Sequence, residues 1–235
     1  MIRRCYDFSN VSMWSTTFRR FSDGQVPVIG PITVAVHDWT RPATGESRLF
    51  QQDFLERFTF ARPAVPIAIY APVGAAFAWY AEHAGVGWPT VAAAYGAGLL
   101  VWTLVEYVMH RFSFHHAPAT RLEVAIAYLV HGVHHAYPDD SRRWMMPLVV
   151  TMPILAALTL LAYTAGGVGA LPVLGGFVHG YLAYDTLHHA IHRGANRSRA
   201  LRWLRKHHMQ HHYATPDKRF GVSSPLWDVI FRTSR

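Results

Sequence analysis

Residues 90–115 read TVAAAYGAGLLVWTLVEYVMHRFSFH, an apolar run that contains one acidic residue, Glu106, and that ends on two histidines, His110 and His115. Its apolar part, up to His110, matches the roughly 20 residues that a helix needs to cross the hydrocarbon core of a bilayer. The sequence therefore predicts a membrane span that carries histidines at one end.

The same pattern recurs along the chain. All 22 Lys and Arg residues fall within residues 3–62, 111–143 and 193–235, so residues 63–110 and 144–192 contain no basic side chain. A soluble helix usually carries charged residues on its exposed face, which disfavours the alternative of buried helices in a soluble all-α protein. Each gap divides at a turn into two segments of about spanning length. The predicted spans are residues 63–82, 90–110, 145–164 and 171–187.

The distribution of charge also predicts an orientation. Every basic block lies on one side of the two predicted helical hairpins, and the positive-inside rule places that side, with both termini, in the cytoplasm. Residues 1–21 lack the apolar core of a secretory signal. The excess of Arg over Lys, with frequent Ala and Gly, indicates a bacterial inner membrane, or the endoplasmic reticulum if the source is eukaryotic.

The expected fold is an all-α integral membrane protein with four transmembrane helices in two hairpins and a cytosolic helical cap. Residues 63–235 form this membrane domain, and residues 119–135 and 198–212 have the periodicity of cap helices. Residues 1–62 form an N-terminal cytosolic or interfacial segment, punctuated by Gly and Pro. Within it only residues 49–60 are predicted to be helical, either along the membrane surface or as a linker.

Four histidine clusters lie at the ends of the apolar segments. Histidines three or four residues apart share one helical face, but His110 and His115 are five apart, so the helix must stop or unwind after His110 for both to face one metal. Ten histidines exceed the roughly four ligands of one tetrahedral zinc ion, which favours a binuclear metal centre over unrelated histidines. The candidate ligands are His110, His115, His131, His134, His135, His188, His192, His208, His211 and His212.

The chemistry of these ligands narrows the choice of metal. Cys5 is the only cysteine, so the ligands are nitrogen and oxygen, which suits zinc, copper, iron or nickel. Two irons could activate O2 and accumulate the oxidising equivalents that the attack on a C–H bond of a lipid requires, whereas zinc could not. Glu106 and Asp185 lie close to His110 and His188 in the sequence. We expect them to accept the second N–H of ligand imidazoles or to position the substrate.

Five segments of the chain carry a resemblance to a known family: HRFSFH at 110–115, HGVHH at 131–135, YDTLHHAIH at 184–192, KHHMQHHY at 206–213 and FGVSSPLWD at 220–228. With them the chain resembles the membrane di-iron fatty acid hydroxylase and sterol desaturase superfamily, and within it the hydroxylase domain of fatty acid 2-hydroxylases. The resemblance runs from about residue 60 to the C-terminus.

The resemblance implies an activity and a cofactor. The ten histidines would hold two iron ions, with zinc able to replace them in purified protein, and the enzyme would use O2 to hydroxylate the 2-position of a fatty acyl chain, free or in a ceramide-like sphingolipid. Tyr213 and the loop of residues 220–227 would close the site and hold the lipid head group.

The expected partners are a lipid substrate and an electron donor. Relatives of this type often carry a cytochrome b5 domain, and residues 1–60 contain no haem-binding histidine pair, so we expect a separate donor such as a cytochrome b5, a ferredoxin or a reductase. A nucleic-acid partner is excluded, because the basic residues follow the membrane topology. Two alternatives stay open: a hydroxylase or desaturase of another lipid (sterol, carotenoid or aminolipid), and a metal-binding membrane protein without catalysis.

Overall fold

The computed structural model describes residues 24–40, 42–194 and 198–235, and Cys5 and the expected lack of a signal in residues 1–21 lie outside them. The chain forms β1 (Gly24–Ile29), β2 (Ile32–Val36), α2 (Asp53–Arg57), α3 (Ala64–His83), α4 (Trp88–Val108), the π-helix η2 (Met109–Phe114), α5 (Arg121–Ala127), the π-helix η3 (Tyr128–Gly132), α6 (Val133–Ala136), the 3₁₀ turn η4 (Ser141–Arg143), α7 (Leu148–Gly166), the 3₁₀ turn η5 (Gly167–Ala170), α8 (Leu171–His192), α9 (Arg199–Tyr213) and α10 (Leu226–Ile230).

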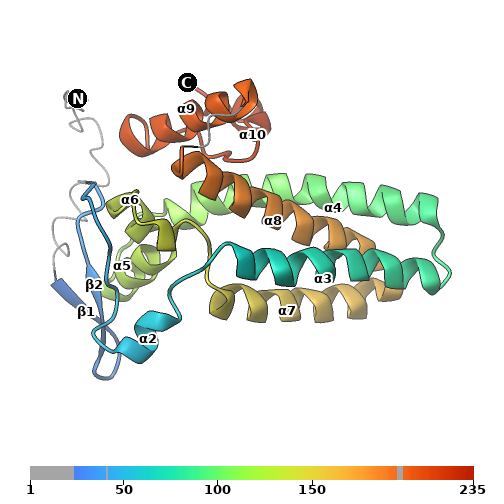
Figure 1. Ribbon diagram of the computed structural model, residues 1–235, viewed down its shortest axis with the longest axis horizontal. Coiled ribbons are helices and arrows are strands. Elements are labelled where there is room, and N and C mark those ends of the chain that lie inside the picture. Colours follow the sequence, from blue (N-terminus) through green and yellow to red (C-terminus); the bar gives the residue numbers. More distant parts are fainter. Residues whose placement is uncertain (1–23, 41, 195–197) are drawn as a thin grey trace.

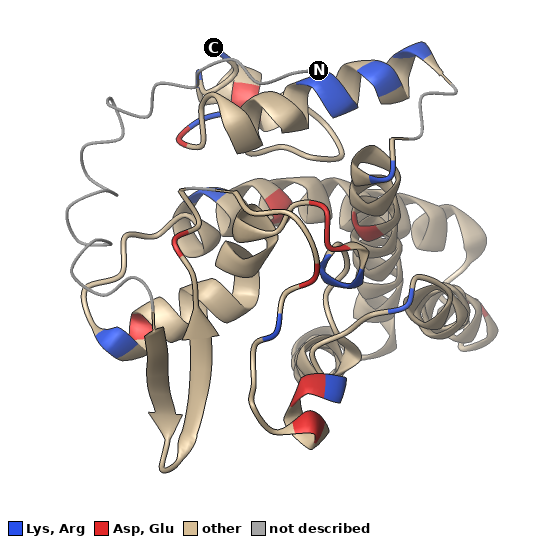
Figure 2. Cartoon of the chain, turned by 60° about the vertical axis from the view of Figure 1, so that its left-hand side comes forward, with Lys and Arg blue, Asp and Glu red and all other residues tan. Residues whose placement is uncertain are grey.

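Four long helices, α3, α4, α7 and α8, lie side by side, and the shorter elements gather at one end of them (Figure 1). Three stretches are long and apolar enough to cross a membrane: Ala64–His83, Trp88–Phe114 and Ser141–His192, the last of which contains both α7 and α8. None of the four long helices contains a Lys or Arg, and the Lys and Arg residues that the structure describes lie in the cap and loops (Figure 2). The protein is therefore a mostly helical integral membrane protein, as predicted.

Small residues let α4 and α8 approach closely. A Cβ atom at Gly98 or Gly176 would collide with the carbonyl oxygen of Val173 or Tyr95 on the facing helix. Gly180 has too little room for a side chain as well, because its Cβ would lie 2.6 Å from Cβ of Trp102. Contacts of this kind are typical of helix pairs in membranes, where small residues allow dense packing. The packing fixes the relative depth of the two helices whose ends carry histidines.

The β1–β2 hairpin belongs to the same folded body as the helical cap. Val34 of β2 and Leu49 share a buried core with Val124 of α5 and Tyr128 of η3. The predicted helix over residues 49–60 is wrong at both ends, since only Asp53–Arg57 is helical. The side chain of Glu56 accepts hydrogen bonds from the backbone N–H of residues 49 and 50, at 3.0 and 2.9 Å, and holds that stretch in a non-helical turn.

A buried ion pair connects this N-terminal part to the chain before α7. The Arg143 side chain is 2% exposed and its Nη2 lies 2.7 Å from Oε1 of Glu56. The Arg143 Nε donates to the Ser47 hydroxyl at 2.9 Å, and Asp140 accepts from the same hydroxyl. Arg143 directly precedes Trp144, whose carbonyl contacts the histidine site described below. The network therefore fixes a loop that the site depends on.

We expect Glu56→Gln to lower the thermal unfolding midpoint of the purified protein clearly, because breaking a buried ion pair leaves a charge unpaired and costs about 3–5 kcal/mol. Asp53→Asn is the matched control: it removes the exposed Arg48–Asp53 pair, which solvent screens, and should change the midpoint little. Equal shifts in both variants, measured in the same detergent, would show that the Glu56 pair contributes no more than a surface pair.

Candidate metal centre

The first histidine pair is brought together by a π-helix. The N–H of His115 donates to the carbonyl oxygen of His110 at 3.2 Å, five residues away, which is the hydrogen-bond spacing of a π-helix. Of the two expected alternatives, the helix does not stop after His110 but unwinds locally, because α4 widens into a π-helix that continues to Phe114. The two rings face each other, with centroids 5.0 Å apart.

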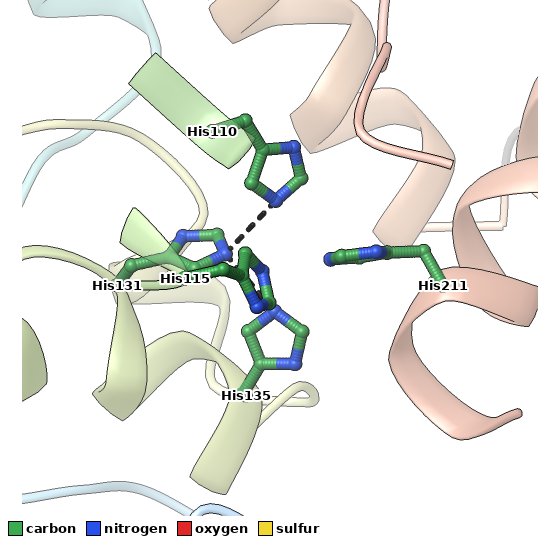
Figure 3. Close-up of side chains that lie close together, drawn as sticks. All are labelled: His110, His115, His131, His135 and His211. Carbon is green, nitrogen blue, oxygen red and sulfur yellow. Dashed lines mark hydrogen bonds between the residues drawn. The ribbon is translucent and has the colours of Figure 1, made fainter. Parts of the chain in front are cut away.

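All ten candidate ligands gather into two groups of five. In each group the potential ligand nitrogens lie within 4.8 Å of one another. Figure 3 shows the rings of one group converging from different helices. We define the first histidine group as His110, His115, His131, His135 and His211, and the second histidine group as His134, His188, His192, His208 and His212.

The two groups share one plan. Each combines a pair from the end of a long helix, an i,i+4 pair from one histidine triplet and the middle histidine of the other triplet. The triplet of residues 131–135 thus gives its outer pair to the first group and His134 to the second, while the triplet of residues 208–212 does the reverse with His211. Through these two middle histidines, each of α6 and α9 contributes to both groups: His134 of α6 contacts His212 of α9, and His211 of α9 contacts His135 of α6.

The arrangement within a group fits a bound cation better than hydrogen bonding. The Nε2 atom of His208 lies 3.1, 3.0 and 3.0 Å from the Nε2 atoms of His188, His192 and His212. A neutral imidazole nitrogen offers either one proton or one lone pair, so it cannot satisfy three such contacts at once. A cation among the nitrogens would use all of their lone pairs. The residues present therefore fit a metal ion in each group.

The surroundings keep these imidazoles neutral. Burial, followed by the neighbouring imidazoles, lowers the pKa of His131, His134, His208 and His212 well below its ordinary value. Burial likewise lowers the pKa of His135 to about 3. Neutral imidazole is the form that binds metal, so at physiological pH these side chains are ready to ligate.

Backbone carbonyls orient three of the rings. The Nδ1 atoms of His110, His188 and His211 lie 2.5, 2.9 and 2.7 Å from the carbonyl oxygens of Phe220, Trp144 and Lys218. A proton on Nδ1 leaves the Nε2 lone pair for a metal. Nε2 of His211 is buried and has no hydrogen-bond partner among the described residues, as expected of an atom that faces a cation.

Glu106 and Asp185, the two carboxylates expected beside the ligands, contact neighbouring loops and not the ligand imidazoles. Glu106 is buried and accepts from the N–H of Val222 and Ser223, at 2.6 and 2.8 Å, and from the Ser223 hydroxyl. Asp185 accepts from the Tyr181 hydroxyl at 3.0 Å and from the Met146 N–H at 3.4 Å. The expectation of a direct hydrogen bond to a ligand imidazole is thus wrong: both carboxylates hold the loops whose carbonyls orient the ligands.

Asp228 is a third such carboxylate, and spacing alone did not single it out. It is fully buried and accepts from the N–H of Phe220 and Gly221, at 2.9 and 2.8 Å, and from the Thr233 hydroxyl at 2.8 Å. Its Oδ2 lies 3.2 Å from Nε2 of His207. Burial tends to raise the pKa of Asp228, but these hydrogen bonds outweigh it and hold the pKa below its ordinary value. An ionised Asp228 therefore anchors the loop that contacts His110.

Two aromatic residues border the second histidine group. Tyr213 ends α9, and its ring centroid lies 5.9 Å from that of His212. The Trp144 ring stacks on His192 with centroids 5.6 Å apart, a contact that no spacing rule predicts. On the side of the first group, the Phe220 ring lies 5.7 Å from both His110 and His211, so the loop expected near the site does lie against it.

Fold and site together define an integral membrane protein with a candidate site for two metal ions. A family model described as fatty acid hydroxylase matches residues 95–233, which include all ten histidines. The chain therefore belongs to the fatty acid hydroxylase family, and the resemblance seen in its sequence is confirmed. Membership also makes it an enzyme, an oxidoreductase.

Individual relatives agree with this assignment. The chain is 34% identical over 188 residues to a dihydroceramide fatty acyl 2-hydroxylase of Arabidopsis thaliana, covering 79% of each chain. It is 36% identical over 147 residues to a ceramide very long chain fatty acid hydroxylase of Saccharomyces cerevisiae, covering 58% of this chain and 36% of the relative. The solved hydroxylase domain of full-length Scs7p superposes with a TM-score of 0.74 at 30% identity, covering 80% of this chain and 73% of that one.

Proposed function

We propose that this enzyme hydroxylates the 2-position of a fatty acyl chain, free or within a ceramide-like sphingolipid, in a reaction that consumes O2. The observation that carries the proposal is the convergence of ten histidines into two five-membered groups at the ends of apolar helices. The names of its relatives, which act on dihydroceramide and ceramide acyl chains, support the substrate class.

In this proposal all ten histidines bind two iron ions, and zinc can take their place in a purified sample. Bound iron would supply the redox chemistry by which an acyl C–H bond, O2, two electrons and two protons become a C–OH group and water. The chain's own part is positional. Neutral imidazoles provide the lone pairs, and the carbonyls of Phe220, Trp144 and Lys218 aim three of them.

We further propose that α3, α4, α7 and α8 each cross the membrane, which gives four spans in residues 63–235 and leaves residues 24–62 on the side of the cap. The location of every basic block on that side supports a cytoplasmic site and cytoplasmic termini, facing the cytoplasm from a bacterial inner membrane or from the endoplasmic reticulum. The acyl chain of a membrane lipid would then reach the histidines from the apolar side without entering water.

Two further roles complete the proposal. A separate redox protein, of the cytochrome b5, ferredoxin or reductase type, delivers the electrons from the cytoplasm. Tyr213 and the loop of residues 220–227 lie beside opposite histidine groups, which supports a role for both in holding the lipid head group. Glu106 and Asp185 act through the loops that they hold.

The activity is tested by expressing the wild type and His134→Ala in a host that lacks the gene, together with a reductase, and comparing their lipids by mass spectrometry. We expect a mass increase of one oxygen atom, localised by fragmentation to the acyl carbon next to the carbonyl, with the wild type only. The same increase on a sterol or carotenoid would replace the proposed substrate. No increase, with the acyl lipid confirmed present, would contradict the proposed activity.

A further inference from the structure

The short helix α10 lies against the membrane-spanning part of α4. Nε1 of Trp227 donates to the Thr103 hydroxyl at 3.0 Å, and the Phe231 ring stacks on Tyr107 with centroids 5.3 Å apart and planes at 17°. Figure 1 shows α10 beside α4. Thr103 and Tyr107 belong to the apolar stretch Trp88–Phe114, which is long enough to cross a membrane.

The depth of this contact follows from helix geometry. An α-helix rises about 1.5 Å per residue, so Tyr107 and Thr103 lie about 1.5 and 7.5 Å along the helix axis from the end of α4 at Val108. An element packed on these two residues lies at the level of the boundary between lipid head groups and acyl chains. It does not project into the cytoplasm.

The side of α10 that faces away from the protein is apolar. Val229 is 63% exposed and Ile230 53%, and Leu226 and Phe231 are exposed as well. The opposite side carries Asp228, which is fully buried. A contiguous set of large apolar side chains on a protein surface marks an interaction site. In water this face would be costly, because each such side chain gains about 1.5–3 kcal/mol when it is buried.

The α4 surface beyond the α10 contact also exposes apolar side chains, which face lipid in the proposed topology. Leu99 and Leu100 lie one turn from Thr103 towards the middle of α4, and both are exposed. On the other side of the contact, Arg111 donates to the Tyr107 hydroxyl at 2.8 Å, and Arg232 directly follows Phe231 with an exposed side chain. Apolar side chains towards the membrane centre and arginines near the phosphates are the arrangement of a helix that lies in the membrane surface.

We propose that the face of α10 formed by Leu226, Val229, Ile230 and Phe231 is buried among the acyl chains of the adjacent lipid leaflet, so that α10 is a membrane-contacting element in addition to the long helices. The inference rests on the proposed crossing of the membrane by α4. Because Asp228 on the buried side of α10 anchors the loop of Phe220, the six residues 226–231 combine lipid contact on one side with support of the first histidine group on the other.

The test uses nitroxide labels on single cysteines in a Cys5→Ser background, with the full chain in phosphatidylcholine nanodiscs. Val229→Cys probes α10, Leu160→Cys on the exposed side of α7 is the lipid reference, and Ala214→Cys just after α9 is the water reference. Collision of each label with O2 and with a water-soluble nickel chelate is measured by electron paramagnetic resonance. We expect the Val229 label to match the Leu160 label, with high O2 and low nickel accessibility.

Three other results would overturn the inference, and each has a distinct meaning. Nickel accessibility at Val229 equal to that at Ala214 would place α10 in water while leaving the long helices in the membrane. Strong dipolar coupling between Val229 labels of two molecules would make this face a contact between copies. Nickel accessibility at Leu160 as well would refute the proposed membrane topology itself, and α10 with it.

Discussion

His211→Ala is expected to abolish hydroxylation and to lower the bound metal from two ions per chain to one. His211 is fully buried, its ring is aimed by the Lys218 carbonyl, and it is the one residue of its triplet that belongs to the first histidine group. Its removal takes one of five nitrogens from that group and none from the other. We expect activity to fall by more than the 10- to 100-fold loss that is typical of residues that merely orient a ligand.

The measurement is metal per chain by mass spectrometry of the purified protein, together with product formation. His134→Ala should also lose one ion, from the second histidine group, and the double variant should lose both. His116→Ala is the control, because His116 directly follows a candidate ligand, belongs to neither group and has a side chain that is 60% exposed. Two ions retained by His211→Ala would remove His211 from the ligand set.

The parts of this structure that could be predicted from the sequence depend on local regularities. Apolar length and the absence of Lys and Arg predict the long helices because a bilayer imposes that requirement on each segment separately. Spacings of three and four predict that the histidines of a cluster share a face. All ten candidates indeed gather.

The distribution of the histidines between two groups could not be predicted, because it depends on where α6, α8 and α9 lie relative to one another. Three residues rotate a helix by about 60° less than a full turn and four by about 40° more, with 3.6 residues per turn. His134 is therefore turned by about 60° from His131 and by about 100° from His135, and only the packing decides which group each one faces. The spacing of five between His110 and His115 indicated an irregularity, but a π-helix and a helix end satisfy it equally well.

The contacts that support the histidine groups could not be predicted either, because they join residues that are far apart in the sequence. Glu106 accepts hydrogen bonds from Val222 and Ser223, which lie 116 and 117 positions further along the chain. Arg143 bonds to Glu56, which lies 87 positions earlier. Carbonyl oxygens, which aim three of the ligands, are present on every residue and leave no trace in a sequence. Spacing in the sequence therefore predicts the orienting role for the nearest carboxylates, Glu106 and Asp185, which in the structure hold the carbonyl-bearing loops instead.

Asp228→Asn is expected to weaken metal binding in the first histidine group alone. The asparagine keeps one acceptor oxygen but replaces the other with an NH2 group, and that position faces the N–H of Gly221 and Nε2 of His207. A donor would then oppose the Gly221 donor, and Gly221 has no room to shift because even a Cβ atom there would collide with the Ser224 carbonyl. The loop would move, and the Phe220 carbonyl would no longer aim His110.

The expected loss is about 10- to 100-fold in metal affinity, as for other groups that orient a metal ligand. It is measured by equilibrium competition with a chelator in two backgrounds. His134→Ala leaves the first histidine group as the stronger site, and there Asp228→Asn should weaken the bound ion. His211→Ala leaves the second histidine group as the stronger site, and in that background Asp228→Asn should not change the metal affinity. Asp217→Asn, an exposed acid in the preceding loop, serves as the control and should change neither.

These two backgrounds separate a positioning role from a structural one. Loss of buried hydrogen bonds to a charged group costs roughly 1.5–3 kcal/mol each, so Asp228→Asn also lowers the stability of the whole fold. A global loss would weaken the ions of both groups by a similar factor, whereas misdirection of His110 reaches only the group to which His110 belongs. Equal weakening in both backgrounds would therefore show that Asp228 acts on the fold and not through the Phe220 carbonyl.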